Sequence, residues 1–463
     1  MLNEQIVKKL RDIVGKDDVF TAKEDLICYS YDSTWISHLP DAVVAPASTK
    51  EIALVVKLAN EQKIPIVPRG GGTNLSAGSV PIEGGIVIAL HRMNKILEID
   101  TDNLTATLEP GVITAALHKA VEKVGLFYPP DPSSMFMSTL GGNVAENAGG
   151  PRGVKYGITR DYVQGLEVVT PTGGIVRCGG KTIKNVSGYD LMRLFTGSEG
   201  TLGIITEITV RLLPLPEAKR TLLAVFDSLD VAAKAVSDVI KNRIIPTSLE
   251  LMDNNAMKLI EAFKPVGLPL DADGVILIEV DGSTDEVGRQ IEKVAETCKA
   301  CGAREVKIAQ DADQAAKLWE GRRSAFGVMA KSAPTVITED ATVPRSKVPD
   351  IVRAIQQIAA KYQLNIPILG HTGDGNMHPI ILTDERNKEE MKRVELAIDE
   401  MFRAALDMGG TLSGEHGIGI VKQKYMQWEF GDEGIALMRA IKQAVDPNNI
   451  LNPGKMFIRG EQT

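Results

Sequence analysis

The stretch Ile64-Pro-Ile-Val-Pro-Arg69-Gly70-Gly71-Gly72-Thr73-Asn74-Leu75-Ser76 ends a short apolar run in three consecutive glycines. Glycine reaches positive φ without strain and lets its backbone approach a ligand closely. Successive N–H groups in such a turn converge on an anion. Arg69 adds a permanent positive charge, and Thr73, Asn74 and Ser76 add hydrogen-bonding side chains. The turn therefore suits a pyrophosphate, although glycine-rich turns also occur where the chain only reverses direction.

Two common nucleotide-binding motifs do not fit this chain. The glycine turn departs from G-x-G-x-x-G because Leu75 stands where the third glycine belongs. The stretch from Gly174 to Thr182 departs from the P-loop because five residues separate Gly174 from Gly180, where the motif requires four. ATP binding at this second stretch is therefore disfavoured.

Five further segments follow the turn in a fixed order. They are Tyr128-Pro-Pro-Asp131-Pro132-Ser133-Ser134, Thr139-Leu-Gly141-Gly142-Asn143-Val-Ala-Glu-Asn147-Ala-Gly149-Gly150, Tyr156-Gly157, Lys184-Asn-Val-Ser-Gly188-Tyr189-Asp190-Leu191 and Gly197-Ser198-Glu199-Gly200-Thr201-Leu202-Gly203-Ile204-Ile205-Thr206. In this order they resemble the flavin domain of the vanillyl-alcohol oxidase / p-cresol methylhydroxylase superfamily.

Three segments of the C-terminal half narrow the resemblance to one branch. They are Gly370-His371-Thr-Gly-Asp374-Gly-Asn376-Met-His378, Ser413-Gly414-Glu415-His416-Gly417 and Asp446-Pro-Asn-Asn-Ile-Leu-Asn452-Pro453-Gly454-Lys455. They look like the corresponding segments of the FAD-linked D-2-hydroxyacid dehydrogenases, a branch that holds D-lactate and D-2-hydroxyglutarate dehydrogenases and the flavin subunit of glycolate oxidase. The likeness spans the chain from about Asp41 to Lys455.

The resemblance implies an α+β fold: a two-part flavin-binding domain of the PCMH type, followed by an α+β cap. Hydrophobic period predicts an antiparallel cap sheet covered by helices on one face. Proline interrupts strand pairing at Pro214-Leu-Pro216, so we expect the domain boundary there. We predict an FAD-binding domain over 1–215, a substrate domain with a metal site over 216–420, and a C-terminal helical segment over 421–463 that returns to the FAD domain.

Length and composition limit the class of protein. A chain of 463 residues exceeds what one core usually organises, and its 44% hydrophobic and 24% charged residues are typical of globular proteins. The net charge of −8 disfavours a nucleic-acid binder. The amphipathic N-terminus lacks the layout of a signal peptide, and no apolar run approaches the ~20 residues of a membrane span. We therefore expect a cytoplasmic protein without a transmembrane segment.

The four cysteines, at positions 28, 178, 298 and 301, are too scattered for a disulfide framework. Cys298-Lys-Ala-Cys301 has C-x-x-C spacing within a predicted helix, so a redox or metal role stays open beside a structural one. The chain has too few suitably spaced thiols to hold an iron–sulfur cluster of its own.

The resemblance implies an FAD site built from the glycine segments. No histidine occurs in Gly72-Thr73-Asn74, where some relatives attach the flavin covalently, so we expect non-covalent FAD. The implied cofactor-binding residues are Pro68, Arg69, Gly70, Gly71, Gly72, Thr73, Asn74, Leu75, Pro132, Ser133, Thr139, Gly141, Gly142, Asn143, Asn147, Gly149, Gly157, Gly200, Gly203, Ile205 and Asn452.

Three of the six histidines lie in glycine-flanked segments of the C-terminal half. His371 and His378 bracket a turn-rich stretch, and Glu415 precedes His416 in a second one. Two histidines and a carboxylate form a common metal-ligand set that leaves open positions for substrate, although a lone histidine is more often structural. The resemblance implies one divalent ion (Zn, Fe or Mn) on His371, His378 and Glu415, and a catalytic base at His416.

The same resemblance places a substrate-binding arginine at Arg322, within Trp319-Glu-Gly-Arg322-Arg323-Ser-Ala-Phe326; a surface ion pair is the alternative role. The strand Val336-Ile-Thr338-Glu339-Asp340 offers no lysine for a second carboxylate. We therefore expect a small substrate such as D-lactate or glycolate, with hydride transfer to FAD and electrons passed to an electron-transferring flavoprotein or iron–sulfur subunit. Alternatives are a D-2-hydroxyglutarate-type dehydrogenase, a non-catalytic electron relay and a metal hydrolase.

Overall fold

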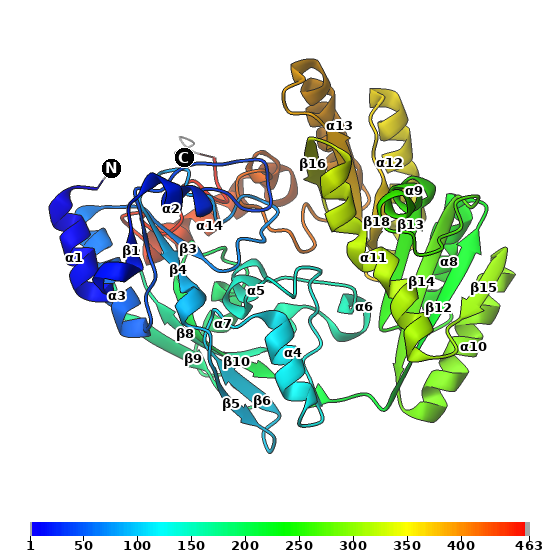
Figure 1. Cartoon of the computed structure of the whole chain (residues 1–463), viewed down its shortest axis with the longest axis horizontal. Helices are drawn as coiled ribbons and strands as arrows, with labels where there is room; N and C mark the ends of the chain where they lie inside the picture. The colour runs from blue at the N-terminus through cyan, green and yellow to red at the C-terminus, as the bar shows by residue number, and fades with distance from the viewer. Residues whose placement is uncertain (1, 459–463) are drawn as a thin grey trace. The chain divides into compact units, whose positions relative to one another are not determined.

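The computed structural model describes residues 2–458, and the chain divides into two compact units (Figure 1). The first unit comprises Met1–Ala148, Ile158–Leu215 and Glu415–Thr463, and the second comprises Gly149–Gly157 and Pro216–Gly414. The expected domain ranges share the boundary after residue 215. They differ in that 149–157 groups with the second unit and 415–420 with the first. Residues 1 and 459–463, which two of those ranges include, lie outside the described residues.

The N-terminal part of the first unit is a four-stranded sheet in the order β1-β2-β4-β3, in which β2, β4 and β3 run parallel. Its strands read as continuous apolar runs because both faces are buried. Ile66, Ile86 and Ile88 pack toward α1 and α3, whereas Val43, Val67 and Val87 face Leu26 and Tyr29. The elements are α1 (Glu4–Val14), β1 (Val19–Phe20), α2 (Lys23–Cys28), β2 (Ala42–Val44), α3 (Thr49–Gln62), β3 (Ile66–Arg69) and β4 (Ile86–Ala89).

The second part of the first unit is a five-stranded antiparallel sheet in the order β5-β6-β10-β8-β9, with a two-stranded β11-β7 pair. The C-terminal segment returns to the first sheet: Ile66 N donates to Ile450 O, and Asn452 N to Ile66 O, both at 2.7 Å. The elements are β5 (Ile96–Asp100), β6 (Thr105–Leu108), α4 (Thr114–Glu122), β7 (Leu126–Phe127), α5 (Leu140–Glu146), β8 (Val163–Val169), β9 (Ile175–Gly179), α7 (Leu191–Phe195), β10 (Ile204–Arg211), β11 (Leu213–Pro214) and α14 (Met426–Val445).

The second unit is built on an antiparallel sheet in the order β15-β12-β14-β13-β18-β19-β16, with β17 paired to β19 (Figure 1). The strands are β12 (Ala218–Phe226), β13 (Ser248–Asp253), β14 (Gly274–Gly282), β15 (Glu305–Ile308), β16 (Thr335–Thr338), β17 (Ala341–Thr342), β18 (Ile368–His371) and β19 (Asn376–Thr383). The helices are α6 (Gly153–Tyr156), α8 (Leu229–Lys241), α9 (Asn254–Phe263), α10 (Thr284–Ala300), α11 (Ala312–Ser332), α12 (Val348–Tyr362) and α13 (Lys388–Asp407).

Helices cover both faces of this sheet, so the expectation of helices on one face is wrong. Leu223, Val225 and Leu277 join a core with α9 and α11. Their neighbours along the strands, such as Leu222 and Ile276, are equally buried and point to the other face, which α8 and α10 cover. With both faces buried, the strands lose the alternation of apolar and polar residues that marks a one-sided sheet.

The cysteines show no redox pairing. All four thiols are free, and the Sγ of Cys301 lies 3.4 Å from the Asp238 carboxylate. Burial raises the pKa of Cys298 to about 12, which leaves its thiol unreactive at neutral pH. The geometry favours the structural interpretation of the C-x-x-C pair. Between residues 2 and 458, no helix is both long enough and apolar enough to span a bilayer.

Candidate active site

The glycine turn after β3 packs tightly against the segment that precedes α5. A Cβ on Gly70 would collide with the Thr139 hydroxyl, and one on Gly71 with the Met137 carbonyl. Gly72 has a φ of +66°, and a Cβ there would meet the Arg69 guanidinium. Larger residues would force the two segments apart. Glycine is therefore needed at these positions for packing before any ligand is considered.

The backbone of this turn offers a row of donors. Among the described residues, none accepts a hydrogen bond from the amides of Gly71, Gly72, Thr73, Asn74 or Leu75. Consecutive N–H groups without protein partners, on a partly exposed turn, are the arrangement that binds a phosphate. This observation fits the pyrophosphate of FAD.

Two side chains expected to face the cofactor are instead used to shape the turn. Arg69 is buried and donates to the Tyr31 carbonyl at 2.6 Å and the Ser79 hydroxyl at 3.3 Å; burial lowers its pKa. Asn74 Oδ1 accepts from the amides of Ser76 at 2.9 Å and Gly78 at 2.6 Å. Arg69 therefore contributes its charge beside the turn, and Asn74 fixes the turn's curvature.

The other glycine segments of the first unit converge on the same turn. Asn452 Nδ2 donates to the carbonyls of Gly78 at 2.8 Å and Glu199 at 2.7 Å, and a Cβ on Gly200 would contact the Pro68 ring. The amide of Glu199 donates to Ala145 in α5. Segments more than 370 residues apart in sequence, as Gly78 and Asn452 are, thus meet at one place.

The remaining expected cofactor residues differ in their surroundings. Thr139 caps α5 and accepts from Gly142 N, Asn143 donates to the Thr114 hydroxyl, and Asn147 ends α5 with a φ of +57°. Gly149 and Gly157 group with the second unit rather than with the turn. Leu75 lies in the turn itself, and Pro132 and Ser133 lie in the loop after β7. Gly141 lies at the start of α5 against Pro110, and Gly203 lies just before β10 against Val168. Ile205 lies within β10.

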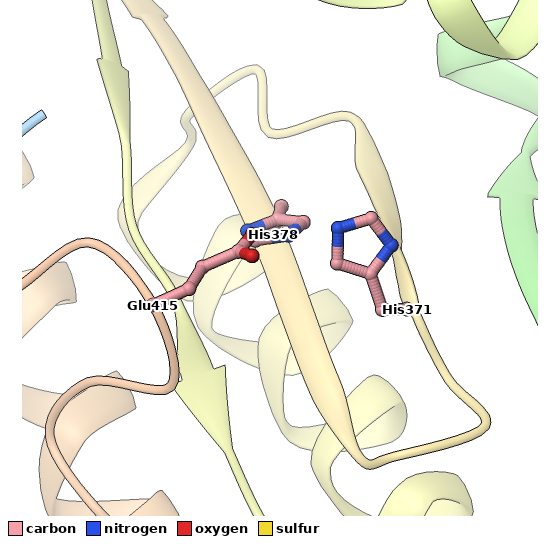
Figure 2. Close-up of side chains that lie close together, drawn as sticks. All are labelled: His371, His378 and Glu415. Atoms are coloured by element: carbon pink, nitrogen blue, oxygen red, sulfur yellow. The ribbon is translucent and has the colours of Figure 1, made fainter. Parts of the chain in front are cut away.

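His371, His378 and Glu415 are brought together as the sequence predicted: one ligand atom from each lies within 4.8 Å of the others. Figure 2 shows the three side chains directed toward one another. The two histidines occupy a β18–β19 hairpin rather than a loop. His371 pairs with Asn376 across the hairpin, and His378 lies two residues further along β19, so both rings project from the same face. Their ring centroids are 5.0 Å apart.

Both histidines are held through Nδ1, which leaves Nε2 as the ligand atom. His371 Nδ1 lies 2.7 Å from Glu250 Oε1, and His378 Nδ1 lies 3.4 Å from the Glu339 carbonyl. An acceptor at Nδ1 fixes the proton there, which is the usual support of metal-binding histidines. The donor set fits Zn, Fe or Mn, whose bonds of about 2.0–2.2 Å would draw the ligand atoms closer together.

Glu250 was not predicted from the sequence. It lies on β13 and is 0% exposed, and it accepts both from His371 and from Arg322 Nε at 2.7 Å. Burial favours its protonated form, but interactions with His371 and Arg322 outweigh burial and lower its pKa. A signal was present: a glutamate inside the apolar run Leu249-Glu250-Leu251 requires a buried partner.

Arg322 is buried in α11 and not on the surface, with 6% of its area exposed. This excludes the surface ion pair that the sequence left open. Its partner among the described residues is Glu250, reached through Nε, so its two terminal nitrogens are available for a carboxylate. Arg323 faces outward and lies over the Trp319 ring.

Glu415 and His416 lie in a turn anchored on either side by a buried carboxylate. Before them, Asp340 accepts from the Ser413 hydroxyl at 3.0 Å and the Gly414 amide at 2.8 Å. After them, Glu199 accepts from the amides of Ile418 at 2.8 Å and Gly419 at 2.7 Å. The ring of His416 is buried. Neither Asp340 nor Glu199 was predicted for this role, because nothing local in the sequence links them to the turn.

The chain belongs to the FAD-linked oxidases. Residues 215–456 match the family "FAD linked oxidases, C-terminal domain", and residues 40–179 match "FAD binding domain". The glycolate oxidase subunit GlcD of Bacillus subtilis is 52% identical over 99% of this chain and 98% of its own length. A D-lactate dehydrogenase of Anaerostipes hadrus is 38% identical over 98% of this chain and 97% of its own.

A solved p-cresol methylhydroxylase superposes with a TM-score of 0.78 at 20% identity, covering 99% of this chain and 97% of that one. The predicted fold is thereby confirmed: α+β, with a flavin domain of the PCMH type. The predicted family, enzyme class and FAD cofactor are confirmed by the family matches and the relatives.

Proposed function

We propose that this FAD-linked oxidoreductase oxidises a small 2-hydroxyacid, glycolate or D-lactate, to the 2-oxoacid with the help of one divalent metal ion. The observation that carries the proposal is the convergence of one ligand atom each from His371, His378 and Glu415, with an acceptor beside the Nδ1 atom of both histidines. Relatives named glycolate oxidase subunit and D-lactate dehydrogenase support the substrate class.

In this proposal FAD is bound non-covalently along the glycine turn. The unbonded amides of residues 71–75 would hold its pyrophosphate, with Arg69 supplying positive charge beside them. The segments at 132–149 and 200–205, with Asn452, would form the rest of the site. When bound, the flavin would accept the hydride from the substrate's α-carbon.

Side chains of the second unit, together with Glu415 of the first, would bind and orient the substrate. The terminal nitrogens of Arg322 would hold its carboxylate in the bidentate manner that a guanidinium allows. A divalent ion on His371, His378 and Glu415 would make the substrate hydroxyl more acidic. With Glu250, Arg322 and Glu415 charged, such an ion leaves the site with one net positive charge, which a single substrate carboxylate neutralises.

His416 would take the proton from the substrate hydroxyl at a ring nitrogen. Imidazole suits this step because its ordinary pKa lies near neutral pH. The segment from 336 to 340 presents no lysine for a second carboxylate, which supports a monoacid over 2-hydroxyglutarate. The relative named a subunit supports transfer of the electrons to a separate protein, such as an iron–sulfur subunit or an electron-transferring flavoprotein.

Anaerobic mixing with single 2-hydroxyacids tests the proposed substrate. Glycolate and D-lactate should bleach the flavin absorbance at ~450 nm at least as fast as the enzyme turns over in the steady state. L-lactate and D-2-hydroxyglutarate should bleach it far more slowly. Slow bleaching with all of these would indicate a non-catalytic electron relay. Preferential bleaching by D-2-hydroxyglutarate would contradict the monoacid assignment.

Four alanine variants separate the metal from the base. Replacing His371, His378 or Glu415 should lower bound metal and activity together. Replacing His416 should leave metal and FAD in place while slowing flavin reduction by about 10²–10⁴-fold, the usual contribution of a general base. Metal analysis and stopped-flow reduction on the same samples provide the measurement. If His416→Ala loses metal as completely as His371→Ala, His416 is a ligand and not the base.

A further inference from the structure

Glu250 is a buried carboxylate that two different residues of the second unit share. It is fully buried in the middle of the sheet, where an ionised carboxylate is costly unless it is paired and hydrogen-bonded. Its two oxygens serve two different partners: Oε1 lies 2.7 Å from His371 Nδ1, and Oε2 lies 2.7 Å from Arg322 Nε. One carboxylate thus joins the proposed metal ligand to the proposed substrate-binding arginine.

We propose that Glu250 is a positioning residue that presents His371 to the metal and Arg322 to the substrate carboxylate. The inference rests on the proposed function. A carboxylate only accepts hydrogen bonds, so Glu250 keeps the proton of His371 on Nδ1 and the lone pair on Nε2, where a metal binds. Because Glu250 binds Arg322 through Nε, the two terminal nitrogens of that guanidinium stay available for a substrate carboxylate.

Two neighbouring strands and a helix make this arrangement possible. Glu250 on β13 lies next to Leu251, which pairs with Gly370 of β18, so the carboxylate is adjacent to the strand that ends at His371. Arg322 reaches the same carboxylate from α11, which packs on this sheet. The three residues belong to one unit, so the arrangement does not depend on how the two units are placed.

A neighbouring glutamate provides a matched control. Glu279 lies on β14, the strand next to β13, and is also buried; its carboxylate accepts from the Thr221 hydroxyl at 3.1 Å and the Trp319 indole at 3.2 Å. It therefore shares the burial and the sheet of Glu250 but contacts neither histidine. Glu279→Gln therefore shows how far the loss of any buried carboxylate from this sheet changes the measured Zn²⁺ affinity.

The test measures metal affinity directly in the flavin-loaded protein, stripped of metal by a chelator and titrated with Zn²⁺. Glu250→Gln should weaken Zn²⁺ binding by about 10–100-fold, as loss of a carboxylate behind a metal-bound histidine usually does, and should raise KM for glycolate. The variant Glu250→Asp, which keeps a carboxylate, should recover part of the Zn²⁺ affinity and bring KM part of the way back to the wild-type value. Glu279→Gln should bind Zn²⁺ as the wild type does, and His371→Ala should bind it far more weakly.

A second pair of variants covers the case in which Glu250→Gln leaves Arg322 unpaired and does not fold. Arg322→Met removes the buried cation. Comparing the Zn²⁺ affinity of this single variant with that of the double variant Glu250→Gln/Arg322→Met then isolates the effect of Glu250 on the metal. Equal Zn²⁺ affinity within this pair, or wild-type affinity in Glu250→Gln, would overturn the inference while leaving the proposed function intact. If the wild type binds Zn²⁺ no better than His371→Ala, the metal assignment itself is wrong, and the inference falls with it.

Discussion

Arg322 must satisfy two partners through one guanidinium. Its Nε is committed to Glu250, and the proposed function gives its terminal nitrogens to the substrate. A lysine has one nitrogen and cannot do both, so Arg322→Lys should lose one charge-assisted bond worth roughly 1.5–3 kcal/mol. We expect kcat/KM to fall about 10–100-fold, chiefly through KM, for glycolate and D-lactate alike.

Steady-state kinetics with both acids checks this prediction. Arg323→Lys is the matched control because Arg323 neighbours Arg322 on α11 but faces outward over Trp319; its kinetics should be those of the wild type. Unchanged kinetics in Arg322→Lys would remove Arg322 from the substrate site.

The sequence predicted the candidate metal ligands but not the residues that hold them. His371, His378 and Glu415 could be named because glycine-flanked histidines and a nearby carboxylate have a recognisable pattern, and the structure places them together. Glu250 and Asp340 could not be assigned. Their roles depend on which strand lies beside which, and that pairing brings together residues more than 70 positions apart.

At the scale of elements, strong periodicity predicted helices well. The spacing of apolar residues predicts helices over 284–300 and 348–362, and α10 and α12 have these same bounds. The strand β19 was missed, because the sequence predicted only a turn-rich stretch between His371 and His378. Its residues 376–383 are all buried, so they show no alternation, and Pro379 argues against a strand. Pairing with β16, β17 and β18 overrides that local signal.

The glycine turn after β3 leads to a prediction about flavin binding. Gly71→Ala would push its Cβ into the Met137 carbonyl, displacing the turn and its free amides. The variant should purify with less flavin and lose more on dilution, as the ratio of absorbance near ~450 nm to protein would show. Gly288→Ala on α10, where a Cβ meets nothing within 4 Å, should keep full flavin and gain about 0.5–1 kcal/mol in stability. Full flavin occupancy in Gly71→Ala would refute the pyrophosphate assignment.

The first turn of α9 carries a pH-dependent cap. Asp253 accepts from Ala256 N at 2.8 Å, and burial raises its pKa to about 7, well above about 3.9 in the unfolded chain. The folded state therefore binds this proton more tightly. Its contribution to stability is complete below about pH 4 and is lost as pH rises through about 7.

Asp253→Asn keeps an oxygen acceptor for Ala256 and removes the titration. The stability of the wild type should therefore fall relative to that of the variant between about pH 4 and 7. Urea unfolding followed by the fluorescence of Trp319, which shares a core with α9, would measure this in a background with Trp35 and Trp428 replaced by Phe. A difference between the two proteins that stays constant with pH would contradict the assigned pKa.

At the scale of the whole molecule, the contiguous ranges expected from sequence differ from the physical units at short segments. Residues 149–157 follow the flavin motif in sequence, yet Lys155 and Tyr156 bind the Asp281 carboxylate at the end of β14 in the second unit, at 2.5 and 2.9 Å. The order of residues in the sequence cannot reveal that this segment groups with the second unit, because Asp281, which binds Lys155, lies 126 positions away.

The two proposed ligands should each protect a different part of the chain from exchange. FAD added to flavin-free protein should slow amide hydrogen exchange around the glycine turn and the 197–203 segment. Zn²⁺ should slow exchange in β13, β18 and β19. A ligand present at 100 times its Kd stabilises the folded state by about 2.7 kcal/mol. Amides that exchange only when the whole region unfolds should then exchange roughly a hundredfold more slowly. His371→Ala should keep the FAD response and lose the Zn²⁺ response. Protection of the hairpin by Zn²⁺ in His371→Ala, or equal protection of both regions by either ligand, would show that the two sites are not separate as proposed.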